Sequence, residues 1–411
     1  MASTERWLAA FGLATLSSIQ LACAAAADTT AAADSAAAAE APAVEVAEPG
    51  EILFLRGNAQ VDAFRRQQEL AATRRIAAGE ATLPLPPAAE ELDGASLAID
   101  LDGERLSLDA FLEADRYAGF LVLKDGAVVY EGYGFGNSAA TRWISFSVAK
   151  SVVAMLTGAA IADGYITSVD DPVVDYLPKL RNSGYEGATV KDLLQMASGV
   201  AWNEDYADPQ SDVASANYAT LPLYEHLRAK ERVAPPGERF NYNSAETNLA
   251  GTLVRSAIGN NLSTYLSEKI WKPYGMGADA FWNLTEPGGG EFGGCCINAT
   301  LRDYARLGLF ALGDGVLADG TRVLPEGWMA ASRTPSKGYS EYGYFWWLND
   351  ESPAFSALGI FGQTIYINPD SGVVIATHGA WNSADGDDYN RRRDIVIAAI
   401  EGRLAMQAAG G

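Results

Sequence analysis

The order of strand-forming and helix-forming segments constrains the fold of this chain more than any other feature. Residues with β-propensity at 120–123 and 128–130 flank Lys124-Asp125-Gly126, a tight-turn signal that predicts a hairpin. Helical patterns dominate from 152 to about 290, and a closing helix is expected from about 391 to 406. Between these helical regions, strand signals return at 344–347, 364–367 and 373–376. We therefore expect an α+β fold in which early and late strands form one antiparallel sheet flanked by helices, with a large mainly helical insertion.

Composition indicates a globular protein and excludes two classes of partner. The chain has 411 residues with 48% hydrophobic content, which is enough to bury a large core. Its 52 acidic and 30 basic residues give a formal net charge of −22, so it lacks a basic footprint for nucleic acid or an anionic membrane.

From the order of the segments we predict an α/β sheet domain made of 50–150 and 291–411, and a mainly helical domain from 151 to 290.

Residues 1–23 resemble a bacterial export signal, because Arg6 precedes an apolar stretch that leads to small residues around Cys23. Cleavage at a small-x-small site and lipidation of Cys23 both fit, although Gln20 stands where lipoprotein signals usually carry leucine. The Ala-rich residues 24–49 are predicted to form a flexible tether. We expect an exported protein, either periplasmic or attached to a membrane only through a lipid on Cys23.

The cysteines and histidines argue against metal sites and against a histidine-based triad. Cys295 and Cys296 are neighbours, and a bond between them would close a strained eight-membered ring, so we expect two reduced thiols. His226 and His378 are the only histidines, and neither lies in a nucleophile-elbow pattern. The run 385–388 lacks the spacing and terminal glutamate of a calcium loop. We expect no metal and no cofactor, and a serine enzyme of this sequence must use another base.

Ser147 and Lys150 form the most informative pair of side chains. They open an apolar run, and on a helix residues three apart share one face, so the amine can reach the hydroxyl. Near a helix N-terminus, free backbone N–H groups and the dipole favour negative charge on an oxygen. The pair therefore suits acyl transfer by a serine with its own base. A plain helix start fits as well, with Ser145 or Ser147 as N-cap and Lys150 in solvent.

Further motifs follow this pair in order. They are Gly164 to Pro178, Thr189 to Gly199, Phe240-Asn241-Tyr242-Asn243-Ser244, and Ala299-Thr300 to Gly308. Thr189 and Thr300 also begin capping boxes, which predict helix starts. Together the motifs, spread over about 115–400, resemble the serine β-lactamase and penicillin-binding-protein superfamily in its class C-like form. The resemblance is strongest to 6-aminohexanoate-dimer hydrolases and class C-like esterases, and it implies the same sheet-and-insertion fold.

The resemblance implies roles for individual residues. Ser147 would attack a carbonyl carbon to form an acyl-enzyme, with Lys150 and Tyr242 as a proton relay. Lys150 must be neutral for this, and burial at a helix N-terminus lowers a lysine pKa. The backbone N–H groups of Ser147 and Ile360, the latter on an edge strand bordered by glycines, would form the oxyanion hole. A plain edge strand and an ordinary packing tyrosine are the alternatives for Ile360 and Tyr242.

Tyr206, Asn243 and Gln363 are expected to contact substrate. Tyr206 lies in a segment that resembles the one by which nylon-oligomer hydrolases place a tyrosine over the substrate, although a packing role also fits. Gln363 would either bind a substrate carbonyl or cap its strand. Two departures bear on specificity: Ser244 stands where class C lactamases have asparagine, and Ala357-Leu358-Gly359 replaces their Lys-Thr-Gly box.

The sequence is therefore interpreted as an exported serine hydrolase that cleaves small esters or linear amides, including 6-aminohexanoate-type oligomers. A small-molecule ester or amide is the partner that this interpretation implies. Efficient β-lactam hydrolysis is not expected, because the departures remove an amide and a cation. A D-amino-acid peptidase or β-lactamase remains an alternative, and so does a catalytically silent binding protein on the same fold.

Overall fold

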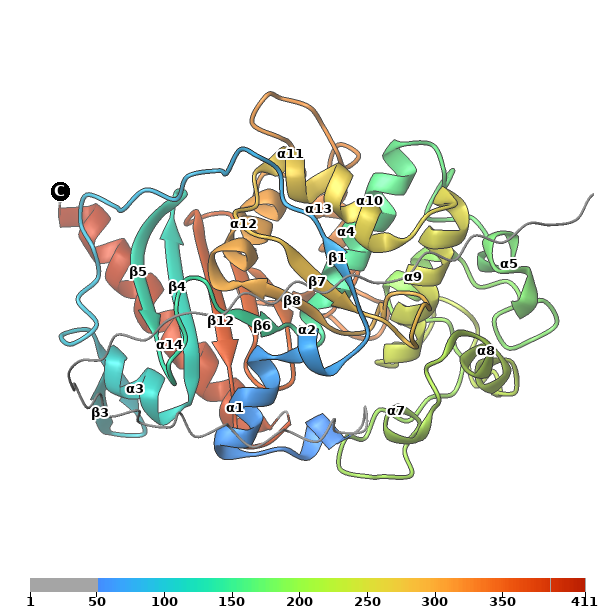
Figure 1. Cartoon of the computed structure of the whole chain (residues 1–411), viewed down its shortest axis with the longest axis horizontal. Helices are drawn as coiled ribbons and strands as arrows, with labels where there is room; N and C mark the ends of the chain where they lie inside the picture. Colours follow the sequence, from blue (N-terminus) through green and yellow to red (C-terminus); the bar gives the residue numbers. More distant parts are fainter. Residues whose placement is uncertain (1–50, 385, 411) are drawn as a thin grey trace, which may run out of the picture. The chain divides into compact units, whose positions relative to one another are not determined.

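The computed structural model describes residues 51–384 and 386–410 of the chain (Figure 1). The predicted export signal, the tether and Cys23 lie outside these residues. The described residues belong to one compact unit, and the division into a sheet domain and a helical domain stays a prediction. None of the helices in the described part is long and apolar enough to cross a membrane.

The main sheet has six strands in the order β5-β4-β12-β11-β10-β9, and all neighbouring pairs are antiparallel. The strands are β4 (Tyr117–Lys124), β5 (Ala127–Tyr133), β9 (Trp347–Leu348), β10 (Phe355–Leu358), β11 (Thr364–Asn368) and β12 (Val373–Gly379). At its centre β4 pairs with β12, which places Leu121 opposite Ala376. Early and late strands therefore form one antiparallel sheet, as predicted (Figure 1).

Most of the predicted strands are confirmed. β4 and β5 form the expected hairpin, and Asp125 and Gly126 turn it with positive φ angles of 50° and 81°. The strand predicted at 344–347 is wrong except at Trp347. Phe345 has a φ of 57°, which bends the chain, and its N–H donates to the Leu194 carbonyl at 2.9 Å instead of to a neighbouring strand.

Side chains on the two faces of the main sheet enter different cores. Phe120 and Val122 on β4 pack in the core that contains residues of α14 (Asp387–Gly410). Leu121 and Leu123 point to the opposite face, into the core that includes α12 (Leu301–Leu312). Full burial of each such side chain contributes about 1.5–3 kcal/mol. The predicted closing helix is thus confirmed as α14, although it begins earlier than expected.

A second, four-stranded sheet has the order β1-β7-β8-β6. Its strands are β1 (Thr73–Ile76), β7 (Ala280–Asn283), β8 (Ile297–Thr300) and β6 (Arg142–Ile144). β7 falls inside the range where helical patterns dominate the sequence. A small hairpin of β2 (Ala98–Leu101) and β3 (Glu104–Ser107) stands apart as a third sheet. β6 leads directly to the helix that begins after Ser147, so this second sheet supports the candidate nucleophile.

Two packed helices, α4 (Val148–Ala162) and α9 (Ser244–Ile258), begin next to the residues of the predicted relay: Lys150 lies in α4, Ser147 directly precedes it, and Tyr242 lies just before α9. All α4 residues from 148 to 160 are buried, as expected for a helix that is apolar on every side. The predicted helix starts at Thr189 and Thr300 are confirmed, and at Thr189 the capping box with Asp192 is complete. The other helices are η1 (Glu51–Phe54), α1 (Gly57–Arg65), α2 (Gln67–Leu70), α3 (Leu108–Ala114), α5 (Val173–Tyr176), η2 (Pro178–Leu180), α6 (Val190–Leu194), α7 (Asp212–Ser215), α8 (Thr220–Arg228), α10 (Leu262–Leu266), η3 (Ser267–Trp271), α11 (Lys272–Tyr274) and α13 (Trp328–Ser332).

Candidate active site

Ser147 occupies the N-cap position of α4, at the end of a short connection from β6. Its side chain makes no capping bond to the helix, and the residue is 9% exposed. Phe146, with a φ of 44°, turns the chain into this position. Ser145 anchors the connection to β8, because its N–H donates to the Ile297 carbonyl and its hydroxyl accepts from the Ile297 N–H, both at 2.8 Å. The Ser147 hydroxyl is thereby held at the start of a buried helix, where the dipole favours negative charge.

Lys150 lies one turn into α4, and its amine reaches the Ser147 hydroxyl. The Lys150 Nζ is 3.0 Å from Ser147 Oγ and 2.7 Å from the Gly294 carbonyl oxygen, to which it donates. Only 2% of the residue is exposed, so the alternative of a solvated lysine at a plain helix start is wrong. Burial lowers the pKa of Lys150 to about 8, against the opposing effect of the Glu204 charge.

Tyr242 lies over the Lys150 amine, just before α9 begins. The Lys150 Nζ is 5.3 Å from the centre of the Tyr242 ring. The ring stacks on Trp347 and meets Tyr342 edge-on, with centroid distances of 5.6 and 5.7 Å. The fold therefore brings together the three residues predicted to form the relay, from two helix starts that lie far apart in the sequence.

Glu204 is a site residue that the sequence did not single out. Its carboxylate accepts hydrogen bonds from the Tyr206 hydroxyl at 2.7 Å and the Ser244 N–H at 3.0 Å. The Ser244 hydroxyl and the Trp202 indole N–H donate to it as well. Its charge also acts on Lys150. In the sequence, Glu204 is marked as a possible site residue only by its position near Tyr206 in a polar, aromatic segment. That segment drew attention to the tyrosine instead.

Tyr206 lies close enough to Glu204 and Tyr242 for both to act on its phenol. Burial, the Glu204 charge and the neighbouring Tyr242 together raise the pKa of Tyr206 well above its ordinary value. The phenol therefore stays protonated and donates a hydrogen bond to the Glu204 carboxylate. This position is compatible with a substrate contact, which stays a prediction.

Ile360 lies in the turn between β10 and β11, not on an edge strand as expected. A side chain at Gly359 would come within 2.6 Å of the Ser145 carbonyl oxygen, so only glycine allows this turn to approach the segment that carries Ser147. Within the described residues, the backbone N–H groups of Ser147 and Ile360 have no hydrogen-bond acceptor. They are therefore available to stabilise an oxyanion.

Gln363 and Asn243 do not have the substrate-contacting positions that we expected. Gln363 is 2% exposed; its amide donates to the Gly379 carbonyl at 2.9 Å and accepts from the Phe361 N–H at 3.1 Å. Asn243 is fully buried and caps α9 by accepting from the Glu246 N–H at 3.1 Å. Gln363 holds backbone with both ends of its amide, and Asn243 does so with its side-chain oxygen. The alternative for Gln363, a structural cap, is the correct one.

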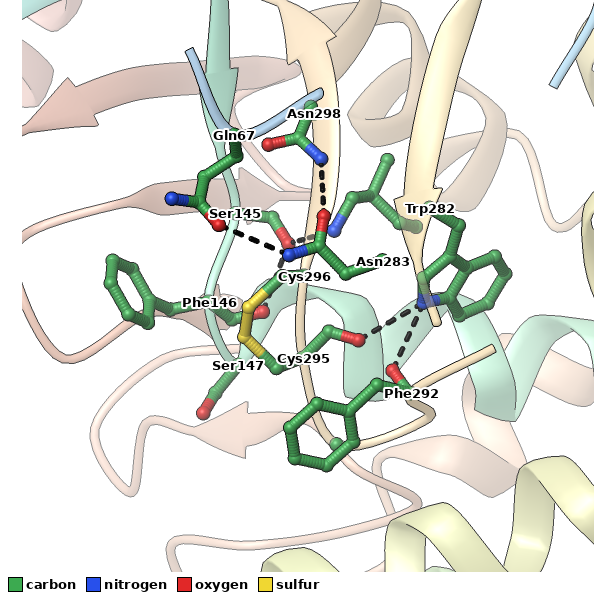
Figure 2. Close-up of a disulfide and its surroundings, with 12 residues drawn as sticks. Gln67, Ser145, Phe146, Ser147, Trp282, Asn283, Phe292, Cys295, Cys296 and Asn298 are labelled. Atoms are coloured by element: carbon green, nitrogen blue, oxygen red, sulfur yellow. Dashed lines mark hydrogen bonds between the residues drawn. A yellow bond between two sulfur atoms is a disulfide. The ribbon is translucent and has the colours of Figure 1, made fainter. Parts of the chain in front are cut away.

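Cys295 and Cys296 are joined by a disulfide, so the expectation of two reduced thiols is wrong (Figure 2). The peptide bond between them is cis. The pair follows Gly294, whose carbonyl accepts the Lys150 amine.

The two histidines lie outside the relay. His226 bonds to Asp212 at 3.0 Å in the helical region. His378 is fully buried, stacks on Trp143 and meets Tyr304 edge-on, and burial lowers its pKa to about 3. No group of three or more His, Cys, Asp or Glu side chains arranged for a metal ion occurs among the described residues.

Comparison with known proteins places the chain in a family. The Beta-lactamase family model matches residues 108–400. A 6-aminohexanoate-dimer hydrolase from Paenarthrobacter ureafaciens is 30% identical over 367 residues, which are 83% of this chain and 91% of that protein.

Two solved structures share the fold. A Bacillus anthracis protein assigned as a 6-aminohexanoate-dimer hydrolase superimposes with a TM-score of 0.77 at 23% identity, over 85% of this chain and 96% of that chain. A family VIII carboxylesterase superimposes with a TM-score of 0.54 at 19% identity, over 71% of this chain and 96% of that one. The predicted fold and the predicted superfamily are therefore confirmed. The chain belongs to the Beta-lactamase family and is a hydrolase of the β-lactamase and penicillin-binding-protein superfamily, related to a 6-aminohexanoate-dimer hydrolase.

Proposed function

We propose that the protein is a serine hydrolase of small esters and linear amides, with Ser147 as nucleophile and Lys150 and Tyr242 as its proton relay. The observation that carries the proposal is the 3.0 Å contact between the Ser147 hydroxyl and a buried amine. A lysine with its pKa near 8 is partly neutral at physiological pH, so it can accept the serine proton.

In the proposed mechanism, the neutral Lys150 amine takes the Ser147 proton as the serine oxygen attacks the substrate carbonyl carbon. The N–H groups of Ser147 and Ile360 stabilise the resulting oxyanion. Tyr242 then passes a proton to the leaving oxygen or nitrogen, which departs and leaves the acyl group on Ser147. Water attacks the acyl-enzyme with the relay running in reverse, and the acid is released.

The surroundings of the relay support a substrate without an anionic group next to the reacting carbonyl. The Ser244 hydroxyl donates a hydrogen bond to the Glu204 carboxylate. The carboxylate of Glu204 therefore brings negative charge to the place where class C lactamases have an asparagine, close to the relay. Ala357 and Leu358, which lie on β10 where the family's lactamases have a cationic box, bring no positive charge. A β-lactam carboxylate would be poorly stabilised here, whereas an ester or linear amide would not. Because the Paenarthrobacter relative is a 6-aminohexanoate-dimer hydrolase, 6-aminohexanoate oligomers are the first amides to test.

The sequence of the first segment leads us to propose export of this hydrolase, either to the periplasm or to a membrane through a lipid on Cys23. The sequence of residues 1–23 is the only support for that proposal. Intact-mass analysis of the protein from a membrane fraction and from a soluble fraction separates cleavage from lipidation.

Ser147→Ala tests the enzymatic proposal. The variant is expected to lose turnover of p-nitrophenyl esters and 6-aminohexanoate dimer, and to lose covalent labelling by a fluorophosphonate probe. Ser151→Ala is the matched control, because Ser151 lies one turn further along α4 and donates to the Phe345 carbonyl instead of facing Lys150. Turnover or labelling that survives in Ser147→Ala contradicts the proposal. Faster turnover of nitrocefin than of the esters would favour a β-lactamase, and a wild-type protein that is never labelled would favour a binding protein.

A further inference from the structure

Residues 293–297 contact Lys150 and the connection that leads to Ser147. At one end, the Gly294 carbonyl accepts a hydrogen bond from the Lys150 amine at 2.7 Å. At the other end, Ile297 makes two backbone hydrogen bonds with Ser145, two residues before the nucleophile. The disulfide between Cys295 and Cys296 lies between these two anchors. A change in this short segment therefore acts on the relay directly.

The backbone around the disulfide is held by neighbours on several sides (Figure 2). The Trp282 indole N–H donates to the carbonyls of Phe292 and Cys295, both at 3.0 Å. The Asn283 N–H donates to the Cys296 carbonyl at 3.0 Å. On the other side of Gly294, the Gly293 N–H donates to the Asn248 side chain on α9 at 2.9 Å. With the disulfide closed, few backbone rotations remain that could move the Gly294 carbonyl away from Lys150.

We propose that the Cys295–Cys296 disulfide positions the Lys150 amine through the Gly294 carbonyl, and that a dithiol reductant converts the protein to a less active form. The inference rests on the proposed role of Lys150 as base. Cys295 and Cys296 are positioning residues, because they act on the relay through Gly294. Cys295 is half-buried and Cys296 is 6% exposed, so a small reductant reaches the pair at Cys295.

The redox step is an ordinary thiol–disulfide exchange. One thiolate of the dithiol attacks a cysteine sulfur, the bond between the two cysteine sulfurs breaks, and a mixed disulfide forms. The second thiol of the reductant displaces the remaining cysteine. Two electrons and two protons pass from the dithiol to Cys295 and Cys296, which become thiols, and the reductant leaves as a cyclic disulfide.

Opening the ring is expected to let water reach the Lys150 amine. The groups that face this amine are Ser147 on its own helix, Glu204, the Tyr242 ring and the Gly294 carbonyl. Desolvation is the main cause of the low pKa of Lys150, so hydration moves that pKa back towards its ordinary value. Less of the lysine is then neutral at pH 7, and Ser147 becomes a poorer nucleophile.

The test compares the full-length protein, purified without reductant, before and after treatment with dithiothreitol. Peptide mapping with a thiol-alkylating reagent first determines whether residues 295 and 296 are bonded. Fluorophosphonate labelling of Ser147 and acetylation of Lys150 by acetic anhydride are then followed against pH. Reduction is expected to slow labelling about tenfold at pH 7, because the neutral fraction of Lys150 falls about tenfold when its pKa moves part of the way back to the ordinary value. It is also expected to raise the midpoint pH for Lys150 acetylation.

Two variants complete the design. The double variant Cys295→Ser/Cys296→Ser is expected to show the labelling rate and acetylation midpoint of the reduced protein, and dithiothreitol is expected to change neither. Cys23→Ser, which removes the third cysteine of the chain, is expected to keep the full response. Free thiols at 295 and 296 in the untreated protein, or the same acetylation midpoint in both redox states, would overturn the inference. Acetylation does not depend on turnover, so a shifted midpoint in a protein that never labels at Ser147 would sustain the positioning role and refute only the proposed hydrolase.

Discussion

Replacing Lys150 with arginine is expected to abolish hydrolysis, because the proposed mechanism requires a base that can lose its proton. Burial lowers the pKa of Lys150 from 10.5 to about 8. At pH 7 a lysine with that pKa is about 10% neutral, whereas an ordinary lysine is about 0.03% neutral, a difference of about 300-fold. The buried position thus provides most of the neutral Lys150 that the proposed mechanism requires.

An arginine at position 150 carries the same positive charge as a protonated lysine, but it cannot lose its proton near pH 7. Its pKa exceeds 12, so its neutral fraction at pH 7 is below about 10⁻⁵. The rate of acylation should therefore fall at least about 10⁴-fold relative to wild type. Lys269→Arg is the matched control, because Lys269 is partly exposed and pairs with Asp163 at 2.7 Å. That variant is expected to keep wild-type rates.

The assay is kcat/KM for a p-nitrophenyl ester, measured from about pH 6 to pH 9.5. Wild-type kcat/KM should rise with pH and level off above a midpoint near the Lys150 pKa of about 8. Unfolding transitions of the wild type and the Lys150→Arg variant show whether the variant is folded. A folded Lys150→Arg protein with more than a few percent of wild-type activity would refute the assignment of Lys150 as the base. A wild-type profile without an ionisation in this range would refute it as well.

Two further predictions concern the region around α9. Tyr242→Phe should lower kcat by about 10²- to 10⁴-fold while Ser147 still accepts a fluorophosphonate, since general acid–base catalysis contributes that much; Tyr339→Phe, in the ring stack with Phe240, is the control, and unchanged kcat in Tyr242→Phe would remove the phenol from the relay. The wild-type protein should lose stability as the pH rises from 5 to 8, and Glu246→Gln should remove this loss. The cause is burial, which raises the folded-state pKa of Glu246 from 4.5 to about 8. The unfolded carboxyl loses its proton first, so wild-type stability falls as pH rises through this window, by up to about 5 kcal/mol. Denaturant unfolding at pH 5, 6.5 and 8 checks this, and equal pH dependence in both proteins would contradict it.

Much of the fold follows from local rules in the sequence. The hairpin at β4 and β5 was predictable because an Asp-Gly turn between two apolar runs has few other solutions. The helix starts at Thr189 and Thr300 were predictable because a capping box is a contact between residues three apart. The strand predicted at 344–347 failed because its aromatic composition suits a strand, while a contact between Phe345 and Leu194 bends the backbone there.

The sequence by itself determined that the Ser147 hydroxyl and the Lys150 amine meet, since the two residues are three apart and a helix start places them on one face. Motif resemblance added Tyr242, and the structure places its ring over the Lys150 amine. Only the tertiary structure decided the rest: the burial that lowers the Lys150 pKa, the carboxylate of Glu204 beside the relay, and the use of Gln363 as a scaffold amide. The bond between Cys295 and Cys296 belongs to this second group. Desolvation and hydrogen-bond satisfaction depend on residues that are distant in the chain, and no local spacing encodes them.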